Sequence, residues 1–422
     1  MARTDVIVLG AGTAGTSAAL QLAKRGRAVA LVDRGAPGEQ TSYGNSGLIG
    51  GSLLPAAFPR ELASVLRVGL KRATEANYHW RALPRLVPWL YAYFQASAPE
   101  RLERTARAWQ PLMANALAEH EGLLRESGAT RYLRKNGWLA LYRSERGFRE
   151  FAPQLALASE LGFRAEPLDA DGARMLEPSL APVFQRAVYW PDMASLSNPL
   201  AVTQAYAARF AALGGVVLTG DARSLHRTAD RWRIDTAEGP VDAPQAVVAL
   251  GPWAPDLLEP LGIRLPLAVK RGYHRHYRPR GNAALSRVVL EAEIGYVLAP
   301  MEQGIRLTTG AEFADRDAPA TPVQIARVMR YAHELFPLGE PVEPKPWMGA
   351  RPIFPDSLPV VGPAPGQPGL WLDYGHGHMG LTFGPVTGRL LAEMMTGETP
   401  FTDPAPFAAE RFARARVARL SG

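Results

Sequence analysis

Three glycines near the start of the chain have the spacing of a phosphate-binding turn. Gly10, Gly12 and Gly15 form the pattern G-x-G-x-x-G directly after the apolar run at residues 5–9. In such a turn the first glycine permits a tight bend, the second lets a pyrophosphate approach the backbone, and the third lets the next helix pack closely. Asp33 ends the following β-rich run, where a carboxylate can bind an adenosine ribose. These residues predict a dinucleotide site without distinguishing NAD from FAD.

Two pairs of histidines, each separated by one residue, raise the question of a metal site. His376 and His378 lie in the sequence GHGHMG at residues 375–380, and His274 and His276 occur in a β-rich run. Alternate residues of a strand share one face, yet no nearby carboxylate or cysteine completes a ligand set around His274 and His276. We therefore expect no metal. The glycines around His376 and His378 instead predict a turn in which backbone approaches a planar ring.

The phosphate-binding turn lies between two expected strands. The run DVIVL at residues 5–9 and the run that ends at Asp33 are short and apolar, as buried parallel strands are. The helix between them is expected to end at Gly26. The order strand, glycine turn, helix, strand and acid is that of a Rossmann-like unit. The N-terminal part of the chain therefore predicts an α/β fold.

Two later segments are expected to contribute similar elements. The sequence SNPLAVTQAYAARFAALGG predicts a helix with Asn198 as N-cap, Pro199 at its first position and Gly214 at its end. Residues 370–374 predict a strand, followed by the GHGHMG turn and a helix after Pro385. Backbone N–H groups and the positive dipole end at the start of that helix can stabilise negative charge.

Composition excludes several kinds of chemistry. The 422 residues are 47% hydrophobic, which predicts a soluble globular protein long enough for two domains. No cysteine occurs, so disulfides, iron–sulfur clusters, cysteine nucleophiles and a cysteinyl–cofactor link are excluded. No apolar run is long enough to span a membrane, and the N-terminus lacks the zones of a signal peptide. The net charge of +7 permits an acidic substrate, an anionic membrane or nucleic acid, but a generally arginine-rich composition also explains it.

Several longer motifs occur in an order typical of one family. They include TSYGNSG at 41–47, VVALGPWAPDLL at 247–258, KRGYH at 270–274 and RPIFPDSLPVVG at 351–362. Over nearly its whole length the chain resembles the D-amino acid oxidase/glycine oxidase superfamily of FAD-dependent amine oxidoreductases, and within it the bacterial D-amino acid dehydrogenases. The resemblance implies noncovalent FAD, because the chain lacks the histidine in the 40s loop and the C-terminal cysteine that tether the flavin in some related enzymes.

The resemblance also implies two domains that are interleaved in sequence. One is an α/β, Rossmann-like FAD-binding domain, and the other is an α+β substrate domain of mixed sheet and helices. The FAD-binding domain is expected to take residues 1–55, 195–260 and 346–422, and the substrate domain residues 56–194 and 261–345.

Four residues are expected to act on the substrate. Arg351 falls where the family binds a substrate carboxylate, and its planar guanidinium suits two parallel hydrogen bonds; a surface salt bridge is the alternative. Tyr273 and Tyr296 are expected as second donors to the carboxylate or amine, with a buried hydroxyl bonded to backbone as the alternative. His378 is expected to face the flavin or substrate and to tune a pKa or the redox potential, without transferring protons.

The other site residues are expected to contact FAD. They belong to the phosphate-binding turn, to Asp33 and Arg34, and to the loop at residues 41–47. Others belong to a strand near the adenine, to the GPW segment at residues 251–253, and to the GHGHMG turn with the start of the helix that follows it. The full set is Gly10, Gly12, Thr13, Ala14, Gly15, Asp33, Arg34, Thr41, Ser42, Asn45, Ser46, Gly47, Val217, Gly251, Trp253, Gly377, His378, Met379, Gly380, Leu381 and Thr382.

The resemblance further implies a reaction and an electron acceptor. Hydride passes from the Cα of a D-amino acid or cyclic D-imino acid to flavin N5, and water hydrolyses the resulting imine to a 2-oxo acid. Electrons pass to a quinone or an artificial acceptor. A quinone lies in the membrane, so we expect a cytoplasmic protein with peripheral contact to the inner membrane. Residues 81–98 could make that contact, although Pro84 and Pro88 also fit an ordinary core helix.

Three other functions fit parts of the sequence. An FAD-dependent oxidase of glycine, sarcosine or another secondary amine would produce hydrogen peroxide. The flavin domain of an RNA-modifying enzyme would need a basic stripe with interleaved aromatic residues, and no such stripe occurs, so no nucleic acid is expected. A plain NAD-dependent dehydrogenase would use the phosphate-binding turn alone.

Overall fold

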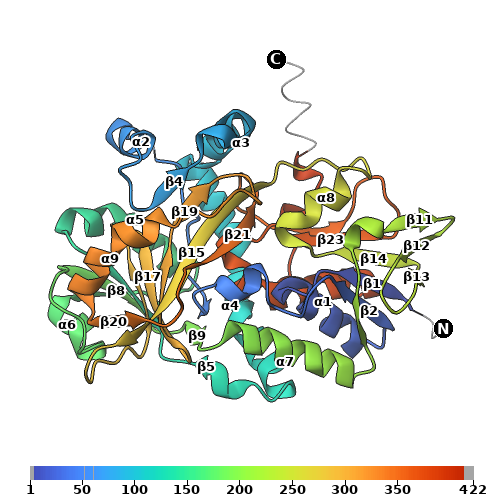
Figure 1. Cartoon of the computed structure of the whole chain (residues 1–422), viewed down its shortest axis with the longest axis horizontal. Helices are drawn as coiled ribbons and strands as arrows, with labels where there is room; N and C mark the ends of the chain where they lie inside the picture. Colours follow the sequence, from blue (N-terminus) through green and yellow to red (C-terminus); the bar gives the residue numbers. More distant parts are fainter. Residues whose placement is uncertain (1–3, 52, 60, 413–422) are drawn as a thin grey trace.

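The N-terminal apolar run forms the centre of a six-stranded sheet, in a computed structural model that describes residues 4–51, 53–59 and 61–412 (Figure 1). Its first five strands are parallel, and the sixth, β22, pairs antiparallel with β23. Every residue of β1 is buried, as its continuous apolar sequence predicts. In spatial order the strands are β10 (Val216–Thr219), β2 (Val29–Asp33), β1 (Val6–Leu9), β14 (Gln245–Val248), β23 (Leu370–Tyr374) and β22 (Val360–Pro363).

Four helices share one hydrophobic core with this sheet. Two glycines let the first and last of them pack unusually closely: a Cβ at Gly384 would lie 3.1 Å from the Ala14 nitrogen, and a Cβ at Gly388 would lie 2.7 Å from the Ala18 nitrogen. The helices are α1 (Thr13–Lys24), α4 (Pro99–Glu126), α7 (Pro199–Ala212) and α10 (Gly380–Thr396).

A smaller layer shares a second core with the same sheet. It consists of a three-stranded antiparallel sheet and a short helix, drawn in green and yellow to the right of Figure 1. Trp232 is its largest fully buried side chain. The elements are β11 (His226–Thr228), β12 (Arg231–Ile234), β13 (Val241–Ala243) and α8 (Ala254–Leu258).

A larger mixed sheet stands beside the first one (Figure 1). Its central strand is β15 (Ala268–Pro279), which pairs along its length with strands on both sides. The other strands are β4 (Ala76–Tyr78), β6 (Trp138–Tyr142), β7 (Glu166–Asp169), β8 (Arg186–Trp190), β16 (Val288–Glu291), β17 (Tyr296–Met301), β18 (Gly304–Thr309), β19 (Ala311–Phe313), β20 (Leu338–Pro341) and β21 (Trp347–Ile353). A separate short sheet joins β3 (Leu48–Ile49), β5 (Leu133–Arg134) and β9 (Ala194–Leu196).

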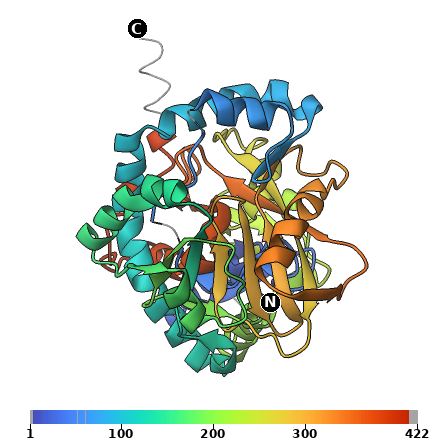
Figure 2. The same ribbon diagram turned by 90° about the vertical axis from the view of Figure 1, so that its left-hand side faces the viewer.

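Helices cover the larger sheet on its outer side and at one end. Helix α9 (Val323–Leu335) packs its buried residues against β15, β17 and β18 (Figure 2). Helices α5 (Glu145–Glu160) and α6 (Ala170–Leu176) pack beside β6, β7 and β8. Helices α2 (Leu62–Gly69) and α3 (Leu83–Ala96) lie together at the top of the molecule in both ribbon views.

The structure confirms several helix ends and corrects one. Helix α7 has Asn198 as its N-cap, whose side chain accepts a hydrogen bond from Ala201 N at 3.0 Å. Helix α10 was expected to follow Pro385, but it begins at Gly380 and contains that proline. A proline inside a helix leaves the carbonyl four residues earlier without its usual donor. Here that carbonyl, Leu381 O, lies 2.8 Å from Nε2 of the buried His120.

That imidazole suits the role of a neutral donor. Burial lowers the pKa of His120 to about 4, so the ring carries one proton at neutral pH. With Nε2 donating to Leu381 O, Nδ1 can accept from the hydroxyl of Tyr206 at 3.0 Å. A residue of α4 therefore permits α10 to start five residues earlier than its proline suggests.

The strands of each sheet come from separate parts of the chain. All strands of the six-stranded sheet fall within residues 1–55, 195–260 and 346–422. Strand β21 also falls after position 346, yet it pairs with β15 of the larger sheet. Helix α4, expected in the substrate domain, packs against α10. The exact division into domains stays a prediction.

Candidate active site

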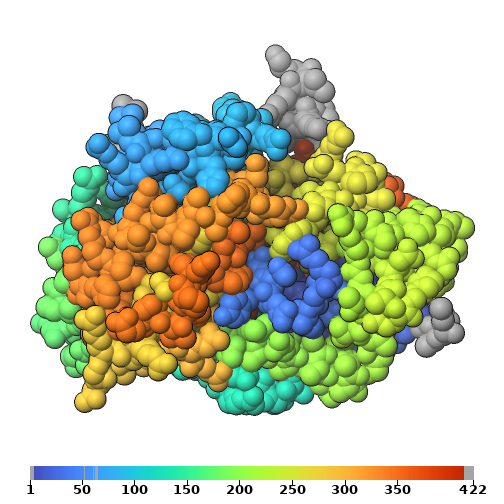
Figure 3. Space-filling view, in the orientation of Figure 1, coloured from blue at the N-terminus to red at the C-terminus, as the bar shows by residue number. Residues whose placement is uncertain are grey.

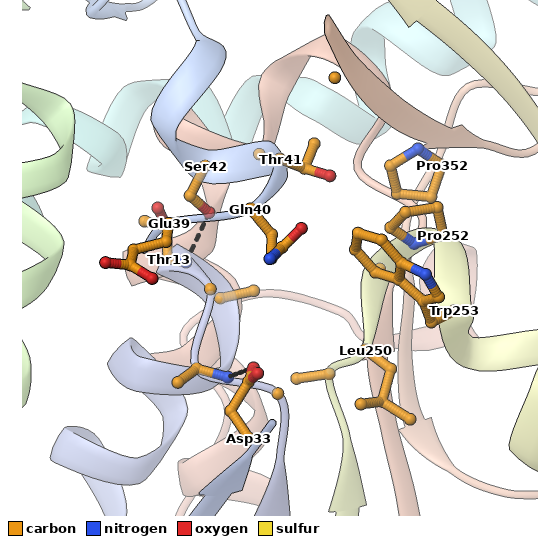
Figure 4. A pocket seen from close by; sticks show the side chains of 18 of the residues that line it. Thr13, Asp33, Glu39, Gln40, Thr41, Ser42, Leu250, Pro252, Trp253 and Pro352 are labelled. Atoms are coloured by element: carbon orange, nitrogen blue, oxygen red, sulfur yellow. Dashed lines mark hydrogen bonds between the residues drawn. The ribbon is translucent and has the colours of Figure 1, made fainter. Parts of the chain in front are cut away.

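A cavity of about 490 Å³ runs from the carboxyl ends of β1 and β2 to the face of β15 and β21. Cofactor sites in proteins have volumes of this order. Figure 3 shows its mouth as a hollow over the blue N-terminal residues, and Figure 4 shows part of its lining. The 3-10 helices η1 (Thr41–Gly44), η5 (Gly251–Trp253) and η6 (Gly377–Met379) contribute to its wall.

One end of the cavity is the predicted phosphate-binding turn. Gly10 has a φ of +101°, which favours glycine, and a Cβ at Gly15 would lie 1.9 Å from Gly10 O. The first turn of α1 has no acidic residue, and its N-cap Gly12 offers no side chain. The Thr13 N–H donates to Ser42 Oγ at 2.9 Å (Figure 4). A helix N-terminus with open N–H groups is a site for an anionic phosphate.

Asp33 lines the cavity beside this turn. Its carboxylate accepts a hydrogen bond from Ala11 N at 2.7 Å (Figure 4). It also accepts one from Gly35 N at 3.0 Å, so it fixes the turn itself. The guanidinium of Arg34 lies 4.6 Å from the ring centroid of Trp253, on the opposite wall. This arrangement can hold a ribose hydroxyl and an adjoining planar group.

The loop at residues 41–47 is held from behind by a buried cation. Arg306 Nη1 donates to Tyr43 O at 2.9 Å and to Asn45 O at 2.6 Å. Arg306 Nε donates at 2.9 Å to Nε2 of His276, whose Nδ1 in turn bonds Glu343. With Arg306 charged, His276 accepts at Nε2 and donates at Nδ1, so this tautomer joins Glu343 to the loop.

The far end of the cavity is lined by glycines that leave space for other groups. A Cβ at Gly44 would lie 1.7 Å from the Trp347 ring, and a Cβ at Gly272 would lie 2.2 Å from Arg351 Nη1. Glycine at position 272 therefore lets the Arg351 guanidinium lie across β15.

Arg351 is the predicted carboxylate-binding residue, and it lines this end of the cavity. Its Nη2 is 3.4 Å from Thr309 O, and no described carboxylate forms an ion pair with it. Burial lowers the pKa of Arg351 to about 10, which still leaves it charged at neutral pH. An unpaired guanidinium in a cavity wall can bind a carboxylate through two parallel hydrogen bonds.

Two further basic residues lie near Arg351. Lys270, directly opposite Arg351 in the β15–β21 ladder, is only 8% exposed. His378 also lines the cavity, where desolvation by burial lowers its pKa to about 4 and the charges of Lys270 and Arg351 add to the effect. The imidazole is therefore neutral at physiological pH. His376 also lines the cavity, where its Nε2 lies 3.0 Å from Thr387 Oγ1 of α10.

The structure places both predicted tyrosines away from the cavity. The Tyr273 hydroxyl donates to Glu312 at 2.6 Å, and the Tyr296 hydroxyl donates to Tyr331 O at 3.1 Å. Both rings belong to the core beneath α9. For Tyr273 the reason is the alternation of β15: Gly272 faces the cavity, so the side chain of Tyr273 must face the other side of the sheet. The assignment of both tyrosines as substrate donors is thus corrected.

Most of the predicted cofactor contacts line the cavity together. They are Gly10, Gly12, Thr13, Ala14, Asp33, Arg34, Thr41, Ser42, Asn45, Gly251, Trp253, Gly377, His378, Gly380 and Leu381. Six others do not line it: Gly15, Ser46, Gly47, Val217, Met379 and Thr382.

The structure shows why two of these six residues, Thr382 and Val217, lie outside the cavity wall. The Thr382 hydroxyl bonds Leu48 O at 3.1 Å and Gly50 O at 3.2 Å, so it ties α10 to β3. Val217 lies within β10, opposite Leu31 of β2, and β10 reaches the cavity only beyond its end, at residues 220–223. Binding groups lie beyond the carboxyl ends of parallel strands, a rule that places the contact after the strand.

Sequence reasoning also missed Lys270, Gly272 and Arg306. The signal for Lys270 and Gly272 is the alternation that places His274 and His276 on one face of a strand. Extended by two and four residues toward the N-terminus, it assigns Gly272 and Lys270 to the same face. Within the described ranges, no three His, Asp or Glu side chains gather as metal ligands.

The mostly parallel sheet, its glycine turn and the cavity at the carboxyl ends of β1 and β2 are features of a dinucleotide-binding protein. The chain belongs to the family described as "FAD dependent oxidoreductase" (DAO), whose model matches residues 5–394. It is similar to a D-amino-acid oxidase of Bradyrhizobium diazoefficiens, at 30% identity over 96% of this chain and 98% of the relative. It is also similar to a D-amino acid dehydrogenase of Chromohalobacter salexigens, at 29% identity over 97% of this chain and the whole of that relative.

A solved structure supports the fold assignment. Glycine oxidase from Geobacillus kaustophilus superimposes with a TM-score of 0.75, at 23% identity, covering 96% of this chain and 98% of that one. At this identity the likeness concerns the fold alone. The cofactor of the family is FAD, and the cavity fits it. The first turn of α1, which has no acidic residue, suits the diphosphate, and Asp33 suits the ribose.

Proposed function

We propose that this protein oxidises D-amino acids or cyclic D-imino acids to imines, which water hydrolyses to 2-oxo acids. FAD, when bound, supplies the redox chemistry by accepting the substrate hydride. The observation that supports this proposal is Arg351, an unpaired cation at the glycine-lined end of the cavity. D-amino acid oxidation is also the activity in the names of several relatives.

The side chains around Arg351 suggest how a substrate is held. The guanidinium binds the α-carboxylate and so fixes the position of Cα. His378 stays neutral, so it can accept or donate a hydrogen bond at the substrate amine without repelling it. No described carboxylate pairs with either residue, so no acidic group is available there to keep the substrate amine protonated.

The proposal is tested with the purified FAD-bound enzyme. We expect reduction of an artificial acceptor with D-amino acids and none with their L-enantiomers. Arg351→Met should lower kcat/KM about ten- to a hundredfold, because a charge-assisted carboxylate interaction contributes about 1.5–3 kcal/mol. Arg149→Met, on the exposed surface of α5, is the matched control. An Arg351→Met enzyme with full FAD content and unchanged kcat/KM would contradict the assignment.

Assays with the same purified enzyme distinguish the proposed function from that of an oxidase of glycine or secondary amines. Glycine oxidase of Pseudomonas aeruginosa is similar to this chain at 28% identity, so an oxidase of glycine, sarcosine or another secondary amine is the second candidate. Oxygen consumption and peroxide production with glycine, sarcosine, D-alanine and D-proline distinguish the two. Peroxide formation that is fastest with glycine or sarcosine would favour the oxidase.

We further propose that the electrons pass to a membrane quinone through contact of α2 and α3 with the cytoplasmic face of a membrane. Among the described helices, none combines the length and apolarity needed to cross a bilayer. However, five large apolar side chains of this end are more than half exposed. They are Leu66 (54%), Leu70 (63%), Trp80 (65%), Val87 (57%) and Tyr91 (55%). We call these five residues the apical patch.

A further inference from the structure

Lys270 occupies an unusual position beside the proposed carboxylate site. In the antiparallel ladder of β15 and β21, Lys270 lies directly opposite Arg351. Residues directly opposite each other project to the same face, with Cα atoms about 5 Å apart. Two long cationic side chains therefore start side by side, and one of them, Arg351, lines the cavity.

Three aromatic rings lie close to the Lys270 ammonium. Its Nζ lies 4.1 Å from the ring centroid of Tyr93, 5.7 Å from that of Trp89 and 5.5 Å from that of Phe313. Trp89 and Tyr93 come from the buried face of α3. Such rings attract a cation through their faces, but they carry no negative charge to balance it.

No carboxylate of the described chain balances this charge. Lys270 forms no ion pair, and the charged groups that act on it come from other elements and are positive. They are Arg351 on β21 and, when protonated, His378 in η6, whose pKa Lys270 lowers. Burial and the charge of Arg351 lower the pKa of Lys270 to about 7. A buried cation without a partner is costly, so an anionic ligand would be stabilised here.

A simple amino acid substrate leaves this charge unpaired. If its single carboxylate binds Arg351, the charge of Lys270 stays without a partner. A second carboxylate on the same molecule changes the balance, because one anion can pair with each cation. The spacing of the two strands suits the two carboxylates of one small molecule.

We propose that Lys270 determines substrate specificity by binding a second anionic group, so that the enzyme prefers amino acids with acidic side chains. This inference rests on the proposed function, in which Arg351 holds the α-carboxylate. It names the substrate class as D-amino dicarboxylates. The rings of Trp89, Tyr93 and Phe313 hold the Lys270 ammonium in place.

The test compares acids with amides of the same shape. We expect kcat/KM for D-glutamate to exceed that for D-glutamine, or D-aspartate that for D-asparagine, by about tenfold or more. Lys270→Met keeps most of the length of the side chain and removes its charge. It should abolish the preference by slowing only the acid, and Lys270→Arg should restore part of it. Lys24→Met, on the exposed surface of α1, is the matched control.

Binding gives a second measurement that does not depend on turnover. Glutarate and its monoamide are titrated into the FAD-bound enzyme, and the change in flavin absorbance reports binding. Glutarate should bind about tenfold more tightly, and Lys270→Met should remove the difference. Failure of the enzyme to oxidise any D-amino acid would contradict the proposed function, whereas this titration would still report on Lys270.

Two results would overturn the inference. The first is a wild-type enzyme that prefers the amides, or treats acids and amides alike in both assays. The second is a Lys270→Met enzyme with normal FAD content whose kcat/KM falls equally for acids and amides. Either result would show that Lys270 only fills space among the rings of α3 and β19.

Discussion

Lys270 and Arg351 differ in the pH range over which each keeps its charge. The pKa of Arg351 is lowered to about 10 and that of Lys270 to about 7. The first group is therefore a permanent cation at physiological pH, while the second titrates there. His378, with a pKa near 4, and Tyr93, with a raised pKa, stay neutral on either side of Lys270.

This difference predicts a pH-dependent substrate preference. Below about pH 7 Lys270 is protonated and attracts a side-chain carboxylate, and above it the neutral amine does not. The ratio of kcat/KM for D-glutamate to that for D-glutamine should therefore fall as pH rises through about 7. Rate measurements from pH 5.5 to 9 check this, and Lys270→Met should give a flat ratio. A ratio that rises with pH would contradict the assignment of Lys270.

Single residues were predictable where a motif dictates backbone shape, and less so where side-chain direction matters. The glycines at 10, 12 and 15 and the position of Asp33 follow from the geometry of a phosphate-binding turn. Tyr273 was chosen by resemblance, although Gly272 and His274 beside it lie on the opposite face. Strand alternation identifies faces, but which face borders the cavity depends on the packing of α9.

At the scale of elements, buried polar groups position the segments that form the site. His120 supplies the hydrogen bond that Pro385 removes, so α10 can begin at the cavity wall. Arg306 holds the 41–47 loop by two carbonyl oxygens. The strand and helix types were predictable from apolar runs and caps. These two contacts were not, because they join residues 261 or more positions apart.

The Arg306 contacts predict a specific effect on the cofactor. Arg306→Met removes two charge-assisted hydrogen bonds to the loop that carries Thr41 and Ser42, so FAD should dissociate about tenfold more readily. The dissociation constant is measured by adding FAD to apoprotein and following flavin fluorescence. Arg278→Met, at the exposed end of β15, is the matched control. An unchanged dissociation constant would show that the loop is fixed by other contacts.

At the scale of the whole molecule, two sheets built from alternating segments of the chain meet at one cavity. The interleaving was expected from the resemblance, because the hydrophobic pattern alone gives strands without their partners. Strand β21 could not be assigned to its sheet from the sequence. It follows residue 346, where the FAD-binding domain was expected to resume, yet it pairs within the larger sheet and brings Arg351 to the cavity. One side of α3 carries two of the rings close to Lys270, and its other side faces outward.

The outward side of α3 presents apolar side chains to the surface. Val87 and Tyr91 are four residues apart and form one exposed stripe, opposite the buried Trp89 and Tyr93. Nearby, the side chain of Arg85 is 82% exposed. An apolar stripe flanked by arginine favours the surface of an anionic bilayer.

Vesicle binding should therefore depend on the apical patch. The FAD-bound enzyme should sediment with vesicles that contain phosphatidylglycerol, more weakly at high salt because the arginine contribution is screened. Replacing both Val87 and Tyr91 by Ser should weaken binding several-fold, because it removes apolar side chains that would enter the interface. Met175→Ser changes an 83% exposed residue of α6, away from α2 and α3 (Figure 1), and should bind normally. Equal sedimentation of the double variant and the wild type would exclude this end of the molecule as the membrane contact.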